Sequence, residues 1–190
     1  MKLRDSGMPD EAYWESLFDT ELILNSLEID AALGDVIELG CGYGTFSVSV
    51  AKRISGRLLT YDIDPEMAAR TTARAREAKL DNVSCLVRDV FADGFGVEDA
   101  SQDACLLFNI LHCENPAHLL IEAARVVRPG GHVLAIHWRC DIATPRGPSL
   151  DIRPQPEHIV DWARDTRLLT HDGRILTLPP WHYGLRLTRV

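Results

Sequence analysis

Short continuous runs of apolar residues alternate along the chain with stretches in which apolar residues recur at helical spacing. Short runs rich in strand-forming residues read DVIELG, RLLTYDID, NVSCLVRD, DACLLFNIL and HVLAIHW. Stretches with helical spacing stand before or between them, over residues 9–29, 45–55, 65–80 and 117–127. This order predicts strands alternating with helices, which is typical of an open parallel α/β sheet.

Two of the predicted helices begin with the same signal. Asp64 precedes Pro65, and Asn115 precedes Pro116, so each helix has a side chain that can cap its first turn and a proline at its first position. The fourth run, DACLLFNIL, is almost uniformly apolar and predicts a strand that is covered on both faces.

From Cys140 onward the pattern changes. Residues 140–156 (CDIATPRGPSLDIRPQP) are rich in Pro, Asp and Arg and predict a long irregular loop. A helix over residues 157–166 follows, and then two short strands, RILTL and YGLRLTR, whose short PPWH link favours an antiparallel pair. The chain thus predicts an α/β fold: a doubly wound, seven-stranded, mostly parallel sheet with helices on both faces and an antiparallel edge pair.

Composition narrows the class of protein. With 190 residues, of which 46% are hydrophobic, the chain predicts one domain over residues 1–190 that opens with a helical segment over 1–30. A formal net charge of -8 argues against a broad phosphate-binding face, so we expect no nucleic-acid partner. The sequence leaves the oligomeric state open.

No apolar run approaches the roughly 20 residues that a membrane helix needs, and the opening MKLRDSGMPDEAYW lacks the apolar core of a signal peptide. The five cysteines form no CxxC pair, which favours reduced thiols over a disulfide framework or a zinc site. We therefore expect a cytoplasmic protein with no membrane partner and no metal.

Gly40, Gly42 and Gly44 lie between the first predicted strand and the helix that follows, in the sequence VIELGCGYGTF. Glycines at this turn let a ligand lie against the backbone at a helix N-terminus, although a tight turn without a ligand remains the alternative. Dinucleotide enzymes favour GxGxxG, and Thr45 stands where that pattern needs its third glycine.

Three acids follow the first strands. Glu38 beside the glycine turn would repel a pyrophosphate by roughly 3 kcal/mol per charge pair, whereas the cationic groups of S-adenosylmethionine would be attracted to it. Asp62 can hold a ribose diol, with Asp64 as the alternative, and we prefer Asp62 because Asp64 already serves as a helix cap. Asp89 can accept a hydrogen bond from an adenine amino group, or it can be a solvated strand end.

Five motifs, ELGCGYGTFS, LTYDIDPEM, VRDV, DACLLFNILH and VVRPGGHVLAIHW, resemble those of the class I S-adenosylmethionine-dependent methyltransferases in order and spacing over residues 34–139. The final strand pair is similar to that family's reversed seventh strand. The resemblance implies S-adenosylmethionine as cofactor and these contacts with it: Glu38, Gly40, Cys41, Gly42, Asp62, Ile63, Asp89, Val90 and Asn109.

The acceptor of the methyl group is less clearly indicated. The sequence NILH after the fourth strand departs from the Asn-Pro-Pro-aromatic tetrad of enzymes that methylate amino groups, and LPPWHY near the C-terminus is interpreted as a turn. The catalytic residues stay unknown, with His112, His137 and Arg146 as candidates that could equally be structural. Tyr13, Trp14 and Trp138 are expected near the acceptor.

The loop over residues 140–156 is longer than most connections in compact domains, which favours a functional segment on the substrate side, with a passive connector that carries solvated arginines as the alternative. Within it, Arg146, with Arg153 as second choice, is a candidate to pair with an anionic group on the acceptor.

The predicted function is methyl transfer from S-adenosylmethionine to a small-molecule acceptor. A methyltransferase acting on a protein side chain and a non-catalytic S-adenosylmethionine-binding subunit remain alternatives, and an NAD-dependent oxidoreductase is disfavoured by Glu38 and Thr45.

Overall fold

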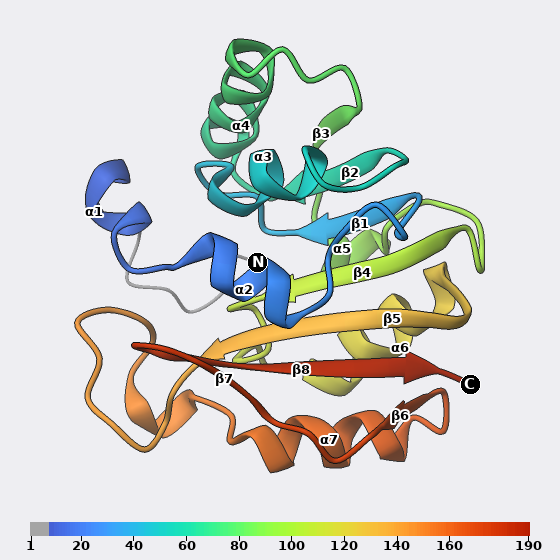
Figure 1. The fold of residues 1–190 in the computed structure, drawn as a ribbon. Helices are drawn as coiled ribbons and strands as arrows, with labels where there is room; N and C mark the ends of the chain where they lie inside the picture. The colour runs from blue at the N-terminus through green and yellow to red at the C-terminus, as the bar shows by residue number, and fades with distance from the viewer. Residues whose placement is uncertain (1–7) are drawn as a thin grey trace.

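A computed structural model describes residues 8–190, and the first seven positions of the expected N-terminal segment lie outside the described residues. The central feature is an eight-stranded sheet in the order β3-β2-β1-β4-β5-β8-β6, with β7 also paired to β8. Figure 1 shows its strands side by side, from β3 at the top to β8 below, with α2 (Thr20–Ser26) in front of the sheet and α6 (Pro116–Val126) behind it. The predicted α/β, doubly wound class is confirmed.

Five parallel strands form the larger part of the sheet, and each corresponds to one of the apolar runs. They are β1 (Val36–Leu39), β2 (Leu58–Asp62), β3 (Val83–Val87), β4 (Gln102–Phe108) and β5 (Val127–Trp138). β1 lies in the middle of this set, paired with β2 on one side and β4 on the other. The chain reverses its direction of winding at β1, so the carboxyl ends of β1 and β4 border a crevice between neighbouring loops.

The antiparallel part differs in detail from the prediction. β8 (His182–Arg189) pairs along its length with β5 and is interior to the sheet, while β7 (Leu176–Leu178) pairs with its first residues as predicted. An additional strand, β6 (Leu169–His171), pairs with the other end of β8 and forms the edge. The strand count is therefore one higher than the sequence predicted, because a three-residue strand carries too little alternation to be recognised.

Helices cover both faces. α2 (Thr20–Ser26) and α3 (Thr45–Ala51) pack on one face with α4 (Pro65–Glu77) beside α3, and the other face carries α5 (Val90–Asp93), α6 (Pro116–Val126) and α7 (Pro156–Asp165). Asp64 and Asn115 cap α4 and α6 as predicted, each accepting a hydrogen bond from the backbone two or three residues on. No helix within residues 8–190 is long and apolar enough to cross a membrane.

The predicted N-terminal helix is in fact two. α1 (Glu11–Glu15) ends at Ser16, and α2 begins after Asp19, whose side chain accepts a hydrogen bond from the Leu22 amide at 3.0 Å. A carboxylate that binds the backbone locally competes with helix continuation, so Asp19 starts a new helix within the apolar stripe.

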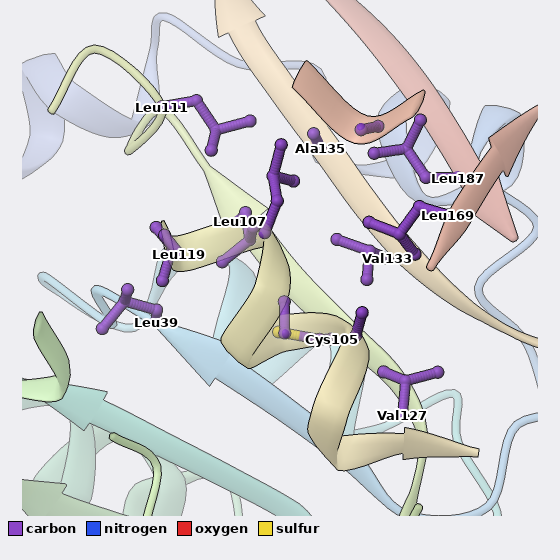
Figure 2. Close-up of a cluster of buried hydrophobic side chains, with 14 of the residues drawn as sticks. Leu39, Cys105, Leu107, Leu111, Leu119, Val127, Val133, Ala135, Leu169 and Leu187 are labelled. Carbon is purple, nitrogen blue, oxygen red and sulfur yellow. The ribbon is translucent and has the colours of Figure 1, made fainter. Parts of the chain in front are cut away.

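The core has two parts, one on each face of the sheet. On the α6 and α7 face, side chains of β1, β4, β5 and β8 meet the two helices, and Figure 2 shows Leu107, Leu119, Val133 and Leu187 pointing into this cluster. The opposite part joins α2 and α3 to alternate residues of the same strands. Central strands covered on both faces explain the continuous apolar run of β4.

Candidate active site

The glycine turn has a backbone that other residues adopt with strain. Gly40, Gly42 and Gly44 have φ values of 83°, 51° and 78°, in the left-handed region. The amides of Gly40 and Cys41 both donate to the carbonyl of Tyr61, at 2.7 and 3.1 Å, which folds the turn over the end of β2. A Cβ on Gly40 would lie 2.9 Å from the Ile110 side chain, so the turn also packs closely against the chain that leaves β4.

A cavity of about 300 Å³ opens beside this turn, at the carboxyl ends of β1, β2, β3 and β4. Of the nine predicted cofactor contacts, all except Glu38 line it. Trp14, expected near the acceptor, and Asp64, the alternative ribose acid, also line it. Further lining residues, which the sequence did not indicate, are Met8, Leu39, Thr45, Phe46, Met67, Arg88, Phe91, Phe108 and Ile110. The structure thus brings residues from four separate loops around one space, and their contacts with a cofactor stay a prediction.

Asp62 is held in place by the turns around it. Its Oδ2 accepts from the Gly42 amide at 3.0 Å, and its Oδ1 accepts from the Asp64 amide at 2.9 Å. A carboxylate has about four acceptor positions, so capacity remains for a ligand hydroxyl. Asp64, the alternative ribose acid, accepts from the Glu66 amide at 2.9 Å as the cap of α4.

Asp89 also combines a local role with a position in the cavity wall. Its Oδ1 accepts from the amides of Phe91 and Ala92 at 3.1 and 3.2 Å, which caps the short α5. The carboxylate therefore stays at the end of β3, where the sequence predicted a contact with adenine.

Two oxygen atoms in the cavity wall are buried without a hydrogen-bond partner. They are Oγ1 of Thr45 and Oδ1 of Asn109. Asn109 has φ 57°, and its amide donates to the Ile136 carbonyl at 2.9 Å, which fixes the residue at the end of β4. Because a buried oxygen without a partner costs about 1 to 3 kcal/mol, these atoms indicate a ligand that supplies hydrogen-bond donors.

Glu38 lies beneath the turn and does not line the cavity. Its carboxylate is 2% exposed and accepts hydrogen bonds from Ser47 at 2.5 Å and Thr60 at 2.7 Å. Burial raises the pKa of Glu38 to about 7, even though both hydroxyl groups favour the charged form. The resemblance placed Glu38 at the methionine end of the cofactor; in the structure it ties β1 to β2 and α3, since its side chain points into the protein.

Three rings of the cavity wall, those of Trp14, Phe46 and Phe108, belong to one aromatic cluster. Phe46 and Phe108 meet edge to face with centroids 5.0 Å apart, and Trp14 joins them through Phe18 at 4.9 Å. The cluster continues to Trp138 and His182, whose centroids are 4.1 Å apart. Trp14 was expected near the acceptor, whereas Tyr13 is 43% exposed and lies outside the cavity wall.

Ion pairs with α4 hold α1, which carries Trp14, beside the cavity. Arg70 binds Glu11 through Nε and Nη2, at 2.8 and 2.9 Å, and Arg74 lies 2.6 Å from Glu15. Tyr43 of the glycine turn donates to the carbonyl of Pro9 at 2.7 Å. These contacts hold Trp14 against the cavity, which neither the helical pattern nor the glycine motif indicated.

His112 and His137 are adjacent. His112 Nδ1 lies 3.3 Å from His137 Nε2, and His137 is completely buried with its Nδ1 3.3 Å from the Trp138 carbonyl. Burial lowers the pKa of His137 to about 3, so the ring is neutral and can orient His112 but cannot reach an acceptor. Neither histidine lines the cavity among the residues that the structure describes.

Arg153 is a structural part of the loop that follows β5. Its guanidinium donates to the carbonyls of Pro148 at 2.8 Å, Arg139 at 2.8 Å and Arg146 at 3.2 Å. With only 9% of its surface exposed, it holds the loop together, and its role as second choice for binding an acceptor anion finds no geometric support. Arg146 is half-buried at the loop's turn.

The loop borders a second cavity, of about 490 Å³, beyond the end of β5. Cys140, Asp141 and Gln155 contribute to it from the loop, and His182 and Tyr183 from β8. Figure 1 shows the loop and α1 both lying beyond the edge at which β4 and β5 end. The loop therefore lies at the carboxyl ends of β4 and β5, and its place beside the substrate stays a prediction.

The sheet is doubly wound and has a reversed strand beside β5, and its cavity combines a glycine turn after β1 with acids at the ends of β2 and β3. These features define the class of nucleoside-binding α/β proteins. The family model for the methyltransferase domain matches residues 36–131 of the 190-residue chain. The protein belongs to the class I S-adenosylmethionine-dependent methyltransferase family, as the resemblance implied.

Individual relatives agree with this family. The chain is 33% identical over 170 residues to a 37.1 kDa protein of transposon TN4556 in Streptomyces fradiae, covering 83% of this chain but 48% of that protein. It is 27% identical over 182 residues to a ubiquinone biosynthesis O-methyltransferase of Xanthomonas oryzae, covering 86% of this chain and 74% of the relative. The chain thus spans about half the length of the first relative.

Among solved structures, an S-adenosylmethionine-dependent methyltransferase from Aquifex aeolicus has the same fold with a TM-score of 0.82. The two sequences are 21% identical, and the match covers 95% of this chain and 94% of that one.

Proposed function

We propose that the protein transfers the methyl group of S-adenosylmethionine to a small molecule with a flat, apolar part. The observation that carries this proposal is the mixed lining of one cavity, which holds the carboxylates of Asp62 and Asp89 together with the rings of Phe46, Phe108 and Trp14. The carboxylates suit a nucleoside, and the rings suit an acceptor that excludes water from the reacting atoms.

The residues of the cavity fit this cofactor. Asp62 can accept both ribose hydroxyls, because the Gly42 and Asp64 amides fix its orientation. Asp89 can accept from the adenine amino group, and exposed Ile63 can cover the base. The unpartnered Oδ1 of Asn109 supplies an acceptor for the ammonium group, while buried Glu38 adds a negative charge behind the turn.

When bound, S-adenosylmethionine supplies a methyl group on a sulfonium, which a nucleophilic atom can attack directly. The chain's contribution is alignment: the aromatic wall orients a flat acceptor, and the glycine turn fixes the other reactant. A base is needed only if the acceptor must lose a proton. His112, with its Nδ1 beside His137 Nε2, is the candidate for that role at the end of β4.

The net charge of the protein and the aromatic rings of the cavity wall together support a small-molecule acceptor. A net charge of -8 is unfavourable for a phosphate backbone, and rings favour flat organic molecules. The name of the Xanthomonas relative, a ubiquinone biosynthesis O-methyltransferase, is compatible with this choice. A protein side chain as acceptor and a non-catalytic cofactor-binding role are the alternatives, and free cysteines accord with the proposed cytoplasmic location.

Calorimetry with the purified protein tests the cofactor. S-adenosylmethionine and S-adenosylhomocysteine should bind at micromolar concentrations and NAD should not. Asp62→Ala should weaken cofactor binding by about 1.5 to 3 kcal/mol, the scale of hydrogen bonds to a charged group. The matched control is Asp64→Ala, which removes the cap of α4 and should leave the affinity unchanged. Binding of NAD alone would end the proposal, and loss of affinity only in the Asp64 variant would exchange the two roles.

The acceptor class is tested by incubating the protein with a cell extract and S-adenosylmethionine that carries a labelled methyl group. Label in small molecules supports the proposal. Label confined to proteins would favour the side-chain alternative, and binding without any transferred label would favour the non-catalytic one.

A further inference from the structure

A pair of thiols that the proposed methyl transfer does not use lies at the wall of the cofactor cavity. Cys41 lies within the glycine turn and lines the cavity, and Cys85 lies on β3. Their sulfur atoms are 3.5 Å apart although 44 positions separate them in the chain. The remaining cysteines, 105, 113 and 140, are free, and no contact within residues 8–190 joins them to another thiol.

We propose that Cys41 and Cys85 are a reversible modification site, at which oxidation to a disulfide weakens cofactor binding. The strands already align the two residues: Cys85 is paired with Thr60 of β2, and the Cys41 amide donates to the carbonyl of Tyr61, the next residue of β2, at 3.1 Å. Bond formation requires the sulfur atoms to approach from 3.5 Å to about 2.0 Å, a movement within reach of side-chain rotation and a small turn shift.

The two thiols differ in reactivity. The hydrogen bond with Cys41 lowers the pKa of Cys85, while the same hydrogen bond, together with burial, raises the pKa of Cys41. Cys85 is half-buried and Cys41 is buried. Because the thiolate is the nucleophile, Cys85 is the sulfur that reacts first with an oxidant.

With a peroxide as oxidant, the chemistry balances in two steps. The Cys85 thiolate attacks one peroxide oxygen, so an S–O bond forms, the O–O bond breaks, and the departing hydroxide takes a proton to become water. The Cys41 sulfur then attacks the Cys85 sulfur, an S–S bond forms, the S–O bond breaks, and the hydroxyl leaves as water with the Cys41 proton. Two thiols are oxidised and one peroxide is reduced to two waters.

The effect on the cofactor follows from the neighbours of Cys41, and this part rests on the proposed function. The Cys41 sulfur lies 3.8 Å from Oδ2 of Asp62, which also accepts from the Gly42 amide. A disulfide replaces the Cys41 thiol beside Asp62 with a sulfur that carries no hydrogen, and it pulls the turn toward β3. We expect the affinity for S-adenosylhomocysteine to fall at least tenfold.

Binding and oxidation must influence each other equally, because the two are thermodynamically linked. A ligand that prefers the dithiol form tenfold raises the reduction potential of the pair by about 30 mV. Bound cofactor would also cover Cys41 in the cavity wall. S-adenosylhomocysteine should therefore slow formation of the disulfide.

The first test identifies the bond in the full chain. The protein is treated with graded hydrogen peroxide, remaining thiols are blocked with N-ethylmaleimide, and tryptic peptides are analysed by mass spectrometry. Cleavage after Lys and Arg leaves Cys41 as the only cysteine of peptide 5–52 and Cys85 as the only cysteine of peptide 80–88. A linked pair of these peptides that disappears with dithiothreitol is expected. Oxidation of Cys140 without this linked pair would overturn the proposal.

The second test measures S-adenosylhomocysteine affinity by calorimetry before and after peroxide. After peroxide, the affinity of wild type and of the matched control Cys140→Ser should fall at least tenfold, whereas Cys85→Ser should keep its affinity. Cys85→Ala is a second variant in case serine disturbs the fold. An equal loss of affinity in Cys85→Ser, or full affinity in wild type that contains the disulfide, would overturn the proposal. A reduced protein that does not bind S-adenosylhomocysteine contradicts the proposed function instead, because the peptide test is independent of any cofactor.

Discussion

The two halves of the sheet edge that carries the site are built in opposite ways. In the cofactor half, at the ends of β1, β2 and β3, polar groups bind backbone close to them in sequence or on the adjacent strand, as Asp62 binds the amides of Asp64 and Gly42. In the half that we propose for the acceptor (the acceptor half), at the carboxyl ends of β4 and β5 and the start of β8, distant segments meet: the rings of Trp14, Trp138 and His182 belong to one cluster. The first half depends on local motifs, and the second depends on the completed fold.

The halves also differ in how they respond to protons. Burial raises the pKa of Glu38 in the cofactor half to about 7, whereas burial lowers the pKa of both His137 and His182 in the acceptor half to about 3. The two buried histidines of the acceptor half therefore stay neutral around pH 7, while Glu38 in the cofactor half changes its charge.

The largest expected effect tests whether the acceptor half depends on one long-range side chain. Arg153→Ala removes the donor to three loop carbonyls. We expect the free energy of unfolding, measured in urea, to fall by about 4 kcal/mol. Each buried acceptor that loses its donor costs about 1 to 3 kcal/mol, and hydrogen bonds to water restore part of this. Arg146→Ala in the same loop is the control and should cost under about 1 kcal/mol. Equal losses would mean that the loop is not organised by Arg153.

The second prediction separates the halves by pH. The folded-state pKa of Glu38, about 7, is above its usual value of 4.5, so its contribution to stability is fully present below pH 4.5 and is lost as the pH rises through 7. His137 and His182 act in the other direction, losing stability as the pH falls below 6.5. The stability of Glu38→Gln relative to wild type, measured by urea unfolding, should thus increase by roughly 3 kcal/mol between pH 4.5 and pH 8.

Exposed Glu98 provides the control for this measurement, since Glu98→Gln makes the same chemical change on the surface. A constant difference between Glu38→Gln and wild type across the pH range would show that the buried carboxyl does not titrate as its surroundings indicate.

The smallest expected effect concerns acceptor binding. If Arg146 pairs with an anionic group on the acceptor, Arg146→Ala should raise the acceptor's KM about tenfold, or about 1.4 kcal/mol, and leave the KM for S-adenosylmethionine unchanged. Arg164→Ala on α7, where the side chain pairs with Asp161 at 2.6 Å on the surface, is the matched control. Kinetics equal to wild type would restrict the loop to a structural role.

Most of the cofactor half could be predicted because its signals are short in sequence. The alternation of strands and helices gave the five parallel strands, and the Asp64-Pro65 pair correctly identified Asp64 as the cap of α4. The ribose contact of Asp62 stays a prediction. Glu38 is the exception: its place in the strand before the glycine turn was correct, but the hydroxyls of Ser47 and Thr60, to which its carboxylate binds, come from other elements. A motif fixes the position of a side chain along the chain and leaves its direction open.

The sequence by itself determined the family, the order of strands and helices, the left-handed glycine turn and the acids at the strand ends, because each depends on neighbours along the chain or on parallel strands that end at one edge. Only the tertiary structure decided the break between α1 and α2, the burial of Glu38, the hydrogen bonds of Arg153 to its loop and the contact between Cys41 and Cys85. These features arise when packing brings distant side chains within a few ångströms, and no local pattern records which partners will meet.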